Sequence, residues 1–544
     1  MGIHMVKKEP FARRSSGLIR QASLLDTFAY NSSASSFVAI LWFYTWVVTF
    51  ALGGNILAAI PFSLVSFSIA ITYAMLVATF PRSGGDYVFN SRVLHPSLAF
   101  GFNFSLVFWQ SFFLAFTYYL IWLSGIGPGL HIVGYLLESP ALVNLGLALM
   151  DPWVAFLLGS VLNVFFTLIA LTGTKKILKV NNLIWILSMI GIAVSIVAMA
   201  VVGNQGFINL FNSFMVKYGG PYGSSPNPYQ AVIAEAGAAG YAAPPFIFSW
   251  PYVALATSAI MWTFYSAYIA GEVKGADSVK RNLVSMAGAG VFNVLLMALF
   301  FYFIFNTFGY EFIASVSYLS YPGQVGLPWS IATETITAFC GLVAQNPLAA
   351  ALSVLGISLA GTLIFVVVLY LQIGRNLFAW SMDRLMPEKL SDVNPRFHSP
   401  IYVNIAAFVL AEVFLLALMV FPDAFWTIYG STIIGPAFSC MFLPGITAAL
   451  LPYRRRDIYE VSPIKREIAG VPLITIFGVI QAAYMLFMVY EYVAWPQFGI
   501  SAPLPLFLNF GMILVGFALY WLIRAIRRRQ GVDIDLAFAE IPPV

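Results

Sequence analysis

The sequence contains little charge for its length. Asp, Glu, Lys and Arg make up 9% of 544 residues, whereas a soluble domain carries about 25%. Hydrophobic residues make up 60% of the chain, and the mean hydropathy is +0.86. So few polar side chains cannot cover a folded surface in water. This composition excludes an ordinary soluble protein and indicates a chain that uses lipid as its solvent.

Cysteine and histidine are also scarce. The two cysteines, Cys340 and Cys440, fall in or near different hydrophobic segments, so no disulfide framework is expected. None of the four histidines lies at the centre of an apolar run, the four being His4, His95, His131 and His398. A membrane enzyme would need a buried His, Cys or carboxylate constellation. We therefore predict no catalytic residue, no metal and no cofactor.

Long apolar runs are what the chain has in abundance. Runs of about 20 residues are long enough to cross a bilayer. Twelve are found, near 27–47, 55–80, 97–123, 151–171, 181–203, 248–270, 283–305, 347–379, 401–421, 427–451, 471–493 and 504–524.

The basic residues alternate along these runs. Of the 27 Lys and Arg residues, all but Lys217 fall in every second gap between apolar segments. Cytoplasmic loops retain Lys and Arg, so the pattern predicts an even number of crossings with both termini in the cytoplasm, in the cell membrane. Topology and anionic lipid explain the net charge of +5 better than nucleic acid does.

Two other features remain open at this point. Glu412 lies well inside the ninth segment, where a charge is either functional or hydrogen-bonded to a neighbouring helix. The outer gap 204–247 is rich in Gly, Pro, Ala, Tyr and Ser, and we expect an ordered or semi-ordered loop that acts either as a lid or as a connector.

The first segment cannot be a simple lipid-facing helix. Residues 31–36 read Asn-Ser-Ser-Ala-Ser-Ser, and such side chains compete for backbone hydrogen bonds. Unwound backbone at membrane depth is tolerated only where it is buried in protein or lines a cavity. The alternative is close helix packing through small residues.

The sixth segment has a related character. Residues 254–268 mix small hydroxyl side chains with aromatic ones, which form either a pocket wall or ordinary packing. Charge parity makes the first segment run outward and the sixth run inward. This is the relation that an inverted repeat of five helices requires, with the first helix of each repeat broken.

Three stretches in the basic gaps carry a family resemblance. Residues 81–87 read Pro-Arg-Ser-Gly-Gly-Asp-Tyr, residues 270–274 read Ala-Gly-Glu-Val-Lys, and residues 374–387 contain Arg375, Ala379, Asp383 and Pro387 in order. Together they resemble the inner loops of amino acid–polyamine–organocation (APC) transporters. A departure is that Gly275, Ala276 and Asp277 replace the usual Asn-Pro.

The resemblance implies an all-α membrane protein of twelve helices. A ten-helix LeuT-like core with broken helices one and six would span 26–452, with repeats at 27–203 and 248–451. Helices eleven and twelve would follow at 453–525, between cytoplasmic tails at 1–25 and 526–544. The implied function is secondary active transport, such as symport, of an amino acid or small amine; an exchanger or a substrate-sensing protein are the alternatives.

The resemblance also implies a substrate site between segments one and six, flanked by three, eight and ten. The substrate carboxylate would meet segment one and its ammonium would meet carbonyls of segment six. The absence of acidic residues at mid-depth in segments one, three, six and eight favours a neutral amino acid. The predicted substrate-binding residues are Asn31, Ser32, Ser33, Ala34, Ser35, Ser36, Ser258, Trp262, Thr263, Phe264 and Tyr265, with Trp262 where the family usually has glycine.

The coupling ion stays open between H⁺ and Na⁺. Ser358 and Thr362 lie one turn apart in segment eight, and with freed carbonyls of segment one they could bind Na⁺ or simply bond back to their own helix. Ser188 stands where many proton-linked or exchanging relatives carry a lysine. Glu412 and Asp26 are the candidate carboxylates for proton coupling.

Overall fold

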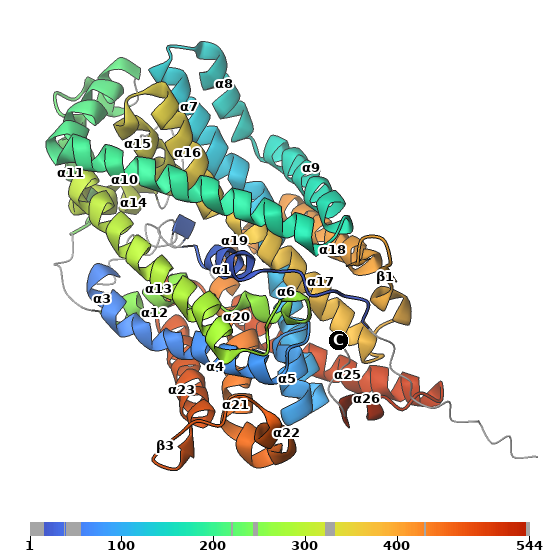
Figure 1. Ribbon diagram of the computed structural model, residues 1–544. Coiled ribbons are helices and arrows are strands. Elements are labelled where there is room, and N and C mark those ends of the chain that lie inside the picture. The colour runs from blue at the N-terminus through green and yellow to red at the C-terminus, as the bar shows by residue number, and fades with distance from the viewer. Residues whose placement is uncertain are drawn as a thin grey trace, which may run out of the picture.

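The computed structural model describes residues 16–36, 38–39, 56–218, 221–242, 249–320, 332–428 and 431–539. These residues form a bundle of helices with two small antiparallel hairpins (Figure 1). The outer half of the first predicted span, residues 40–47, lies outside the described residues.

The helices of the first half run from the N-terminal segment to the long helix α10 and the short helix that follows it. They are α1 (Leu24–Ser33), α3 (Ile56–Ser63), α4 (Phe67–Thr79), α5 (Asp86–Val93), α6 (Pro96–Leu120), α7 (Gly127–Leu136), α8 (Pro140–Leu149), α9 (Pro152–Leu171), α10 (Thr174–Tyr218) and α11 (Pro228–Ala238).

The second half repeats the alternation of long and short helices. It contains α12 (Trp250–Ile260), α13 (Val279–Ile304), α14 (Tyr310–Ser320), α15 (Ala332–Ala344), α16 (Pro347–Gly361), α17 (Val366–Met382), α18 (Ile401–Val420), α19 (Pro422–Ile428), α20 (Ser431–Ala437), α21 (Leu443–Arg454), α22 (Arg456–Val461), α23 (Leu473–Ala494), α24 (Pro503–Leu506), α25 (Met512–Arg529) and α26 (Leu536–Ala539). The strand β1 (Val393–Asn394) pairs with β2 (Ser399–Pro400), and β3 (Glu467–Ile468) pairs with β4 (Val471–Pro472).

Ten helical stretches of the described chain are long and apolar enough to cross a membrane. They are Ile56–Thr79, Pro96–Leu136, Pro152–Leu171, Thr174–Lys217, Val279–Leu319, Leu363–Met382, Ile401–Val420, Ser431–Arg454, Leu473–Ala494 and Pro503–Arg529. Each corresponds to one of the twelve predicted spans. The two spans without a counterpart are the first and the sixth, where α1 and α12 end after 10 and 11 residues.

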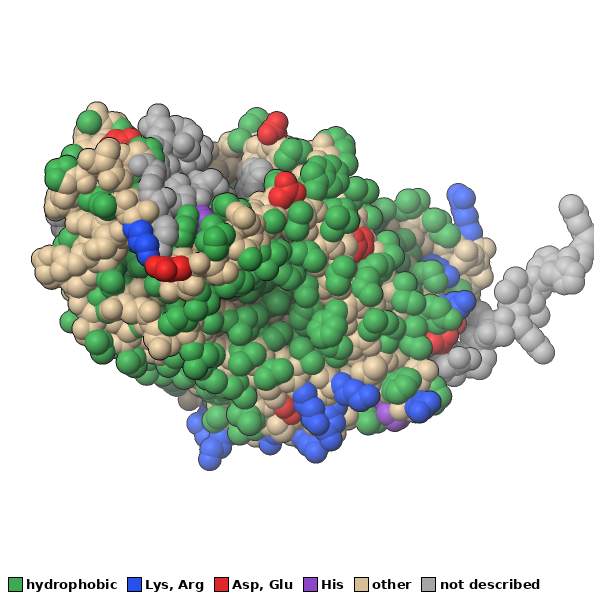
Figure 2. All heavy atoms as spheres, turned by 90° about the horizontal axis from the view of Figure 1, so that it is seen from above, with side chains coloured by type: hydrophobic (Ala, Val, Ile, Leu, Met, Phe, Trp, Pro, Cys, Tyr) green, Lys and Arg blue, Asp and Glu red, His purple; other side chains and the backbone are tan. Residues whose placement is uncertain are grey.

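The helices form a central layer and a lipid-facing rim. In the most apolar part of each span, 94% of the residues are buried in the span that contains α17. The corresponding share is 33% in each of α9, α18 and α23. Large apolar side chains on the rim are exposed, such as Leu157, Val413 and Leu514. Figure 2 shows hydrophobic side chains spread over the middle of one face. This is the distribution expected when lipid replaces water as the solvent.

The predicted basic gaps meet at one end of the molecule. We call residues 80–95, 270–281, 383–400, 454–472 and 524–539 the basic end. Arg455 Nη1 donates to the Arg92 carbonyl at 2.7 Å, and Arg527 Nε donates to the Arg384 carbonyl at 2.9 Å. Ser83 forms a backbone bridge with Ile269. Figure 2 shows Lys and Arg side chains along the lower and right-hand edges of the face.

The outer gap 204–247 differs from the predicted loop because α10 continues to Tyr218, with a kink at Gly203 (φ 62°). Phe207 and Phe211, one turn apart, are buried against Phe312 and Phe339. This apolar stripe keeps the segment helical. Lys217, the exception to the charge pattern, lies near its end.

Lys217 has an acidic partner there. Its Nζ lies 2.6 Å from Glu138 Oε1, and both side chains are mostly exposed. α10 begins next to the basic end, and about 44 Å of helix separates Thr174 from the kink at Gly203, beyond which the chain continues to Tyr218. Lys217 therefore lies far from the other basic residues, as its place in the sequence predicts.

Helices α10 and α16 cross at two glycines. A Cβ added to Gly191 would lie 2.3 Å from the Gly356 Cα and 2.7 Å from the Leu352 carbonyl oxygen. Both atoms belong to the backbone, so a neighbouring side chain cannot move aside to make room. This contact sets the closest approach of the two helices.

Gly191→Ala is therefore expected to lower the melting temperature in detergent, because overpacking of this kind costs about 1–3 kcal/mol. Gly288→Ala is the matched control: it is also a mid-helix glycine, but its added Cβ would have no neighbour closer than 3.7 Å. In the control, alanine lowers the conformational entropy of the unfolded chain, and this stabilises the folded protein by up to about 1 kcal/mol. Equal melting temperatures for the two variants would contradict the crossing described here.

Candidate functional site

The first interruption is held open by an asparagine from another helix. α1 ends at Ser33, and Ala34, Ser35 and Ser36 are not helical. Asn293 of α13 donates from Nδ2 to the carbonyls of Ser32 (3.0 Å) and Ser35 (2.9 Å), and its Oδ1 accepts from Ser32 Oγ at 2.7 Å. The carbonyls freed where α1 ends thus have partners within the protein.

The second interruption lies at the end of α12. The helix stops at Ile260, and residues 261–264 form turns. Ser35 Oγ donates to the Ala259 carbonyl at 2.6 Å, and Trp262 Nε1 donates to the Ser258 carbonyl at 2.9 Å. Side chains therefore bind two of the carbonyls that we expected to meet a substrate ammonium.

A third interruption was not predicted. α16 ends at Gly361, and Thr362 has φ −135° and ψ −83°, outside the helical region. Ser36 Oγ donates to the Ala360 carbonyl in the last turn of α16 and accepts from the Ala39 amide at 3.1 Å. Ser35 and Ser36 therefore connect the ends of α1, α12 and α16.

A cavity lies where these interruptions meet. The atom-free space between its walls is about 780 Å³, including the part that is open to solvent. Its apolar lining comes from Ala34, Ala39, Phe113, Leu120, Trp262, Gly361, Phe365, Val368, Leu369, Ile433 and Pro436. Its polar lining comes from Ser36, Gln110, Thr117, Ser258, Tyr265 and Thr432. The lining elements are those that the family resemblance places around a substrate.

Five of the eleven predicted substrate residues line this cavity, namely Ala34, Ser36, Ser258, Trp262 and Tyr265. The other six are not among the lining residues.

Three of these six have structural contacts. Asn31 accepts from the Ser266 amide at 2.8 Å and donates to the Ser285 carbonyl at 2.9 Å. Ser32 and Ser35 make the contacts described above.

The remaining three are wholly buried. The hydroxyls of Ser33 and Thr263 have no hydrogen-bond partner in the described part of the chain, and the Phe264 ring stacks on Tyr73 with centroids 4.0 Å apart.

Three polar cavity residues were not predicted from the sequence, namely Gln110, Thr117 and Thr432; Gln110 has the largest side chain of the three. Its Nε2 donates to the Tyr265 hydroxyl at 2.6 Å, and its Oε1 has no partner among the described residues. Since the two amide atoms are assigned from the hydrogen-bond network, the atom left over can be a donor or an acceptor. The available signal was that Gln110 is one of two amide side chains in the otherwise largely apolar α6, with Asn103.

The residues proposed for a cation site are only partly brought together. Ser358 Oγ donates to the Val354 carbonyl at 2.6 Å, and Thr362 Oγ1 donates to the Ser358 carbonyl at 2.7 Å. This is the back-bonded alternative. Ser188 lies on α10 with a buried hydroxyl for which the described residues supply no partner.

The two carboxylates considered for proton coupling have structural partners. Glu412 accepts from Ser160 Oγ and from Asn163 Nδ2, both at 3.0 Å, so it joins α18 to α9. Asp26 forms a capping box with Ser23 at the start of α1 and accepts from Asn182 Nδ2 at 2.7 Å. Neither residue lines the cavity.

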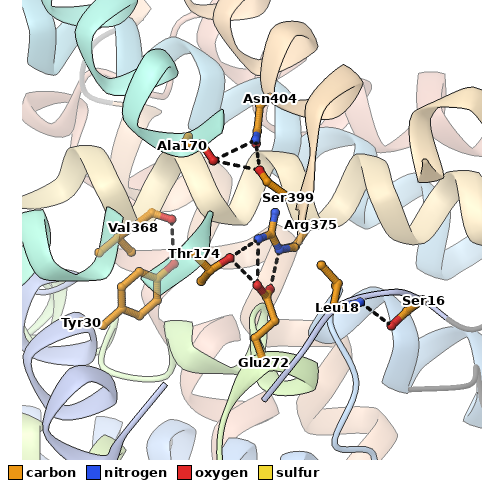
Figure 3. Close-up of polar contacts among 10 residues, drawn as sticks. All are labelled: Ser16, Leu18, Tyr30, Ala170, Thr174, Glu272, Val368, Arg375, Ser399 and Asn404. Carbon is orange, nitrogen blue, oxygen red and sulfur yellow. Dashed lines mark hydrogen bonds and ion pairs between the residues drawn. The ribbon is translucent and has the colours of Figure 1, made fainter. Parts of the chain in front are cut away.

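A buried ion pair joins α17 to the basic end. Arg375 Nε lies 2.6 Å from Glu272 Oε1, and its Nη2 donates to Glu272 Oε2 at 3.0 Å and to Thr174 Oγ1 at 2.8 Å (Figure 3). Arg375 and Glu272 are each 1% exposed. The pair ties α17 to the segment after α12 and to the start of α10.

A second ion pair lies within the basic end. Arg92 donates to both oxygens of Asp383 at 2.7 Å, and the Tyr87 hydroxyl donates to Asp383 Oδ2 at 2.9 Å. Glu272, Arg375, Asp383 and Tyr87 all belong to the three motifs. The motifs are therefore the parts of the chain that hold this end together.

A family model described as amino acid permease matches residues 23–519. No curated protein matches the sequence.

Glu272→Gln is expected to destabilise the protein by about 3–5 kcal/mol, because it leaves the buried Arg375 guanidinium without its counter-charge. The control is Glu460→Gln, the same change in the exposed pair with Arg456, whose two side chains are 81% and 59% exposed. A change within about 0.5 kcal/mol is expected there. Thermal melts in detergent measure both, and a Glu272→Gln melt equal to that of the control would contradict the role of the pair.

Proposed function

Because the chain belongs to the amino acid permease family, we propose that it is a secondary active transporter that moves a neutral amino acid or related small amine by alternating access. It is a multi-pass membrane protein with ten described spans long enough to cross a bilayer. The family predicted from the three motifs is thereby confirmed.

The observation that carries the substrate class is the chemistry of the cavity. None of the described residues that line it is charged. A substrate with a charged side chain would have to lose its hydration without gaining a counter-ion, and this is costly in an apolar site. An amino acid with a neutral side chain brings only its own ammonium and carboxylate, which compensate each other in part.

The polar lining offers contacts for these two groups. Ser36 lies at the point where helix resumes beyond the first interruption, where amides and partial positive charge favour a carboxylate. The spare amide atom of Gln110 and the hydroxyls of Ser258 and Thr432 lie on other walls. Trp262 and Phe365 would enclose the substrate side chain.

Alternating access requires that one side of the cavity be closed at a time. The positive-inside pattern assigns the basic end to the cytoplasm, in the plasma membrane. The two buried ion pairs lie on that side, so the described conformation is the one closed toward the cytoplasm. Transport would then require both pairs to separate or to move together, by rocking of one five-helix repeat against the other.

Reconstitution in liposomes tests the proposal. Vesicles loaded with unlabelled alanine, serine, leucine or phenylalanine should accumulate the same labelled amino acid by counterflow, while arginine and glutamate should not. Counterflow needs a substrate site that reaches both sides, but it needs no ion gradient. The proposal fails if no amino acid or amine shows saturable counterflow.

Gln110→Ala is expected to weaken substrate binding, because a hydrogen bond to a charged group contributes about 1.5–3 kcal/mol, or roughly 10- to 150-fold in the half-saturation concentration. Gln205→Ala is the control, since that side chain is on the exposed surface of α10 and pairs with Asn209. Counterflow at a series of substrate concentrations measures the effect. Unchanged half-saturation in Gln110→Ala would remove Gln110 from the site.

A further inference from the structure

The described chain has four buried carboxylates: Glu272, Asp383, Asp86 and Glu491. The first two are in the ion pairs described above. Glu491 lies on the rim helix α23 and accepts from Trp495 Nε1 at 3.0 Å. Asp86 is 0% exposed at the start of α5, and no basic side chain of the described residues forms an ion pair with it.

Asp86 is held by neutral partners. Asn103 Nδ2 lies 3.2 and 3.4 Å from its two carboxyl oxygens, and Asn103 Oδ1 accepts from Trp380 Nε1 at 2.8 Å. The titratable side chains facing it are Tyr73, Tyr265, Tyr268 and Cys440, all neutral at physiological pH.

The charged side chains on the neighbouring elements are engaged elsewhere. Arg92 of α5 pairs with Asp383 at the end of α17, and Arg375 of α17 pairs with Glu272. Asp86 stands between Gly85 and Tyr87 in the first of the three motifs.

Burial raises the pKa of the Asp86 carboxyl to about 7, against the opposing effects of the Tyr268 and Asn103 side chains. An ordinary aspartate has a pKa of about 4. The group therefore changes its protonation state near physiological pH while it is enclosed, and it would ionise readily if water reached it.

Asp86 and the substrate cavity lie against the same face of α6. The Asp86 partner Asn103 and the cavity residue Gln110 are seven residues apart, which is two helical turns on one face and about 10 Å. The Tyr265 hydroxyl, bound to Gln110, and the Tyr268 ring, 5.3 Å from the Tyr265 ring, lie on the same route.

A second polar stripe faces this route from α17. Phe365 meets Phe113 of α6 with ring centroids 5.2 Å apart, and Trp380 binds Asn103. Gln372 and Asn376 lie between these contacts at helical spacing, so they share the stripe that faces α6. Both amides are wholly buried without a hydrogen-bond partner in the described part of the chain.

We propose that Asp86 is the proton-binding site that couples amino acid transport to the proton gradient. The inference rests on the proposed function and adds the coupling ion. The carboxylate receives a proton from the outer solution through the cavity and the seam between α6 and α17. It holds the proton while the basic end is closed, and it releases the proton to the cytoplasm when that end opens and water reaches it.

The charges balance in this cycle. One proton forms an O–H bond with the carboxylate in the outward state, and the same bond breaks in the inward state. The empty carrier must return with Asp86 ionised, since a carrier that returned with Asp86 protonated would take the proton back out. On this cycle one proton accompanies each neutral amino acid, and net uptake carries one positive charge inward.

The test compares wild type with Asp86→Asn, which keeps the shape of the neutral acid. Labelled alanine or leucine, whichever shows counterflow, is offered with the exterior at about pH 6 and the interior at about pH 7.5. Since each pH unit is worth tenfold per proton, the wild type should accumulate substrate by up to about 30-fold. Asp86→Asn should show wild-type counterflow but no accumulation driven by the gradient. Glu412→Gln, a carboxylate outside the route, should behave as wild type.

The outcomes separate the two proposals. Absence of counterflow in the wild type and in both variants would contradict the proposed transport function. Counterflow without any response of the wild type to the pH gradient overturns proton coupling alone. Full gradient-driven accumulation by Asp86→Asn shows that the proton is carried elsewhere and overturns the assignment of Asp86.

A pH series of thermal melts gives a readout that needs no transport. The folded pKa of Asp86 lies above its unfolded value, so the wild type loses stability as pH rises from about 4 to about 7, with no further loss above that. Asp86→Asn lacks this loss. The melting temperature of the variant should therefore rise relative to that of the wild type as the pH increases over this range. A difference in melting temperature that does not depend on pH would mean a merely structural role.

If Asp86→Asn does not fold, Asn103→Ala provides an alternative test. Removing the amide that lowers the pKa of Asp86 should move the midpoint of pH-driven uptake to higher pH. An unchanged midpoint, with counterflow intact, would overturn the proposal.

Discussion

The need to satisfy backbone polar groups in hydrocarbon is the constraint on which this structure depends. Each unpaired group at membrane depth costs several kcal/mol, and α1, α12 and α16 all end there. Side chains from other segments bind the carbonyls at these helix ends. Ser35 binds a carbonyl at the end of α12, Ser36 binds one at the end of α16, and Asn293 binds one at the end of α1. Because the three interruptions stabilise one another, they meet at one place, and the cavity lies at that place.

This arrangement explains which parts of the site could be predicted. The serine-rich composition of residues 31–36 indicates an interruption correctly, since few other reasons exist for such residues at membrane depth. It does not show which hydroxyls serve the backbone and which face the cavity. A chain that breaks a helix needs partners for its freed carbonyls first, and Ser35, Ser36 and Asn293 supply them.

The residues that escaped prediction are single polar side chains in apolar surroundings. Gln110 and Asn293 carry no local pattern, and their roles depend on helix rotation, which is set by packing against distant segments. Asp86 lies in the first motif, but the motif does not show that its carboxyl is buried beside Asn103. Charge is a stronger signal. The alternation of Lys and Arg predicts which loops share an end, and contacts such as those between Arg455 and Arg92 join those loops. The motifs likewise prove to be contact residues, because Arg375 and Asp383 make the two buried ion pairs.

The amides of Gln372 and Asn376 have an energetic consequence. A buried polar group without a partner costs about 1–3 kcal/mol, and two such side chains lie between α6 and α17 in the closed conformation. In the transport cycle that we propose, water entering this seam would remove that cost when the ion pairs separate. The penalty of the closed state thus offsets part of the work of opening, so the two conformations can be close in free energy, and a carrier needs that closeness to cycle quickly.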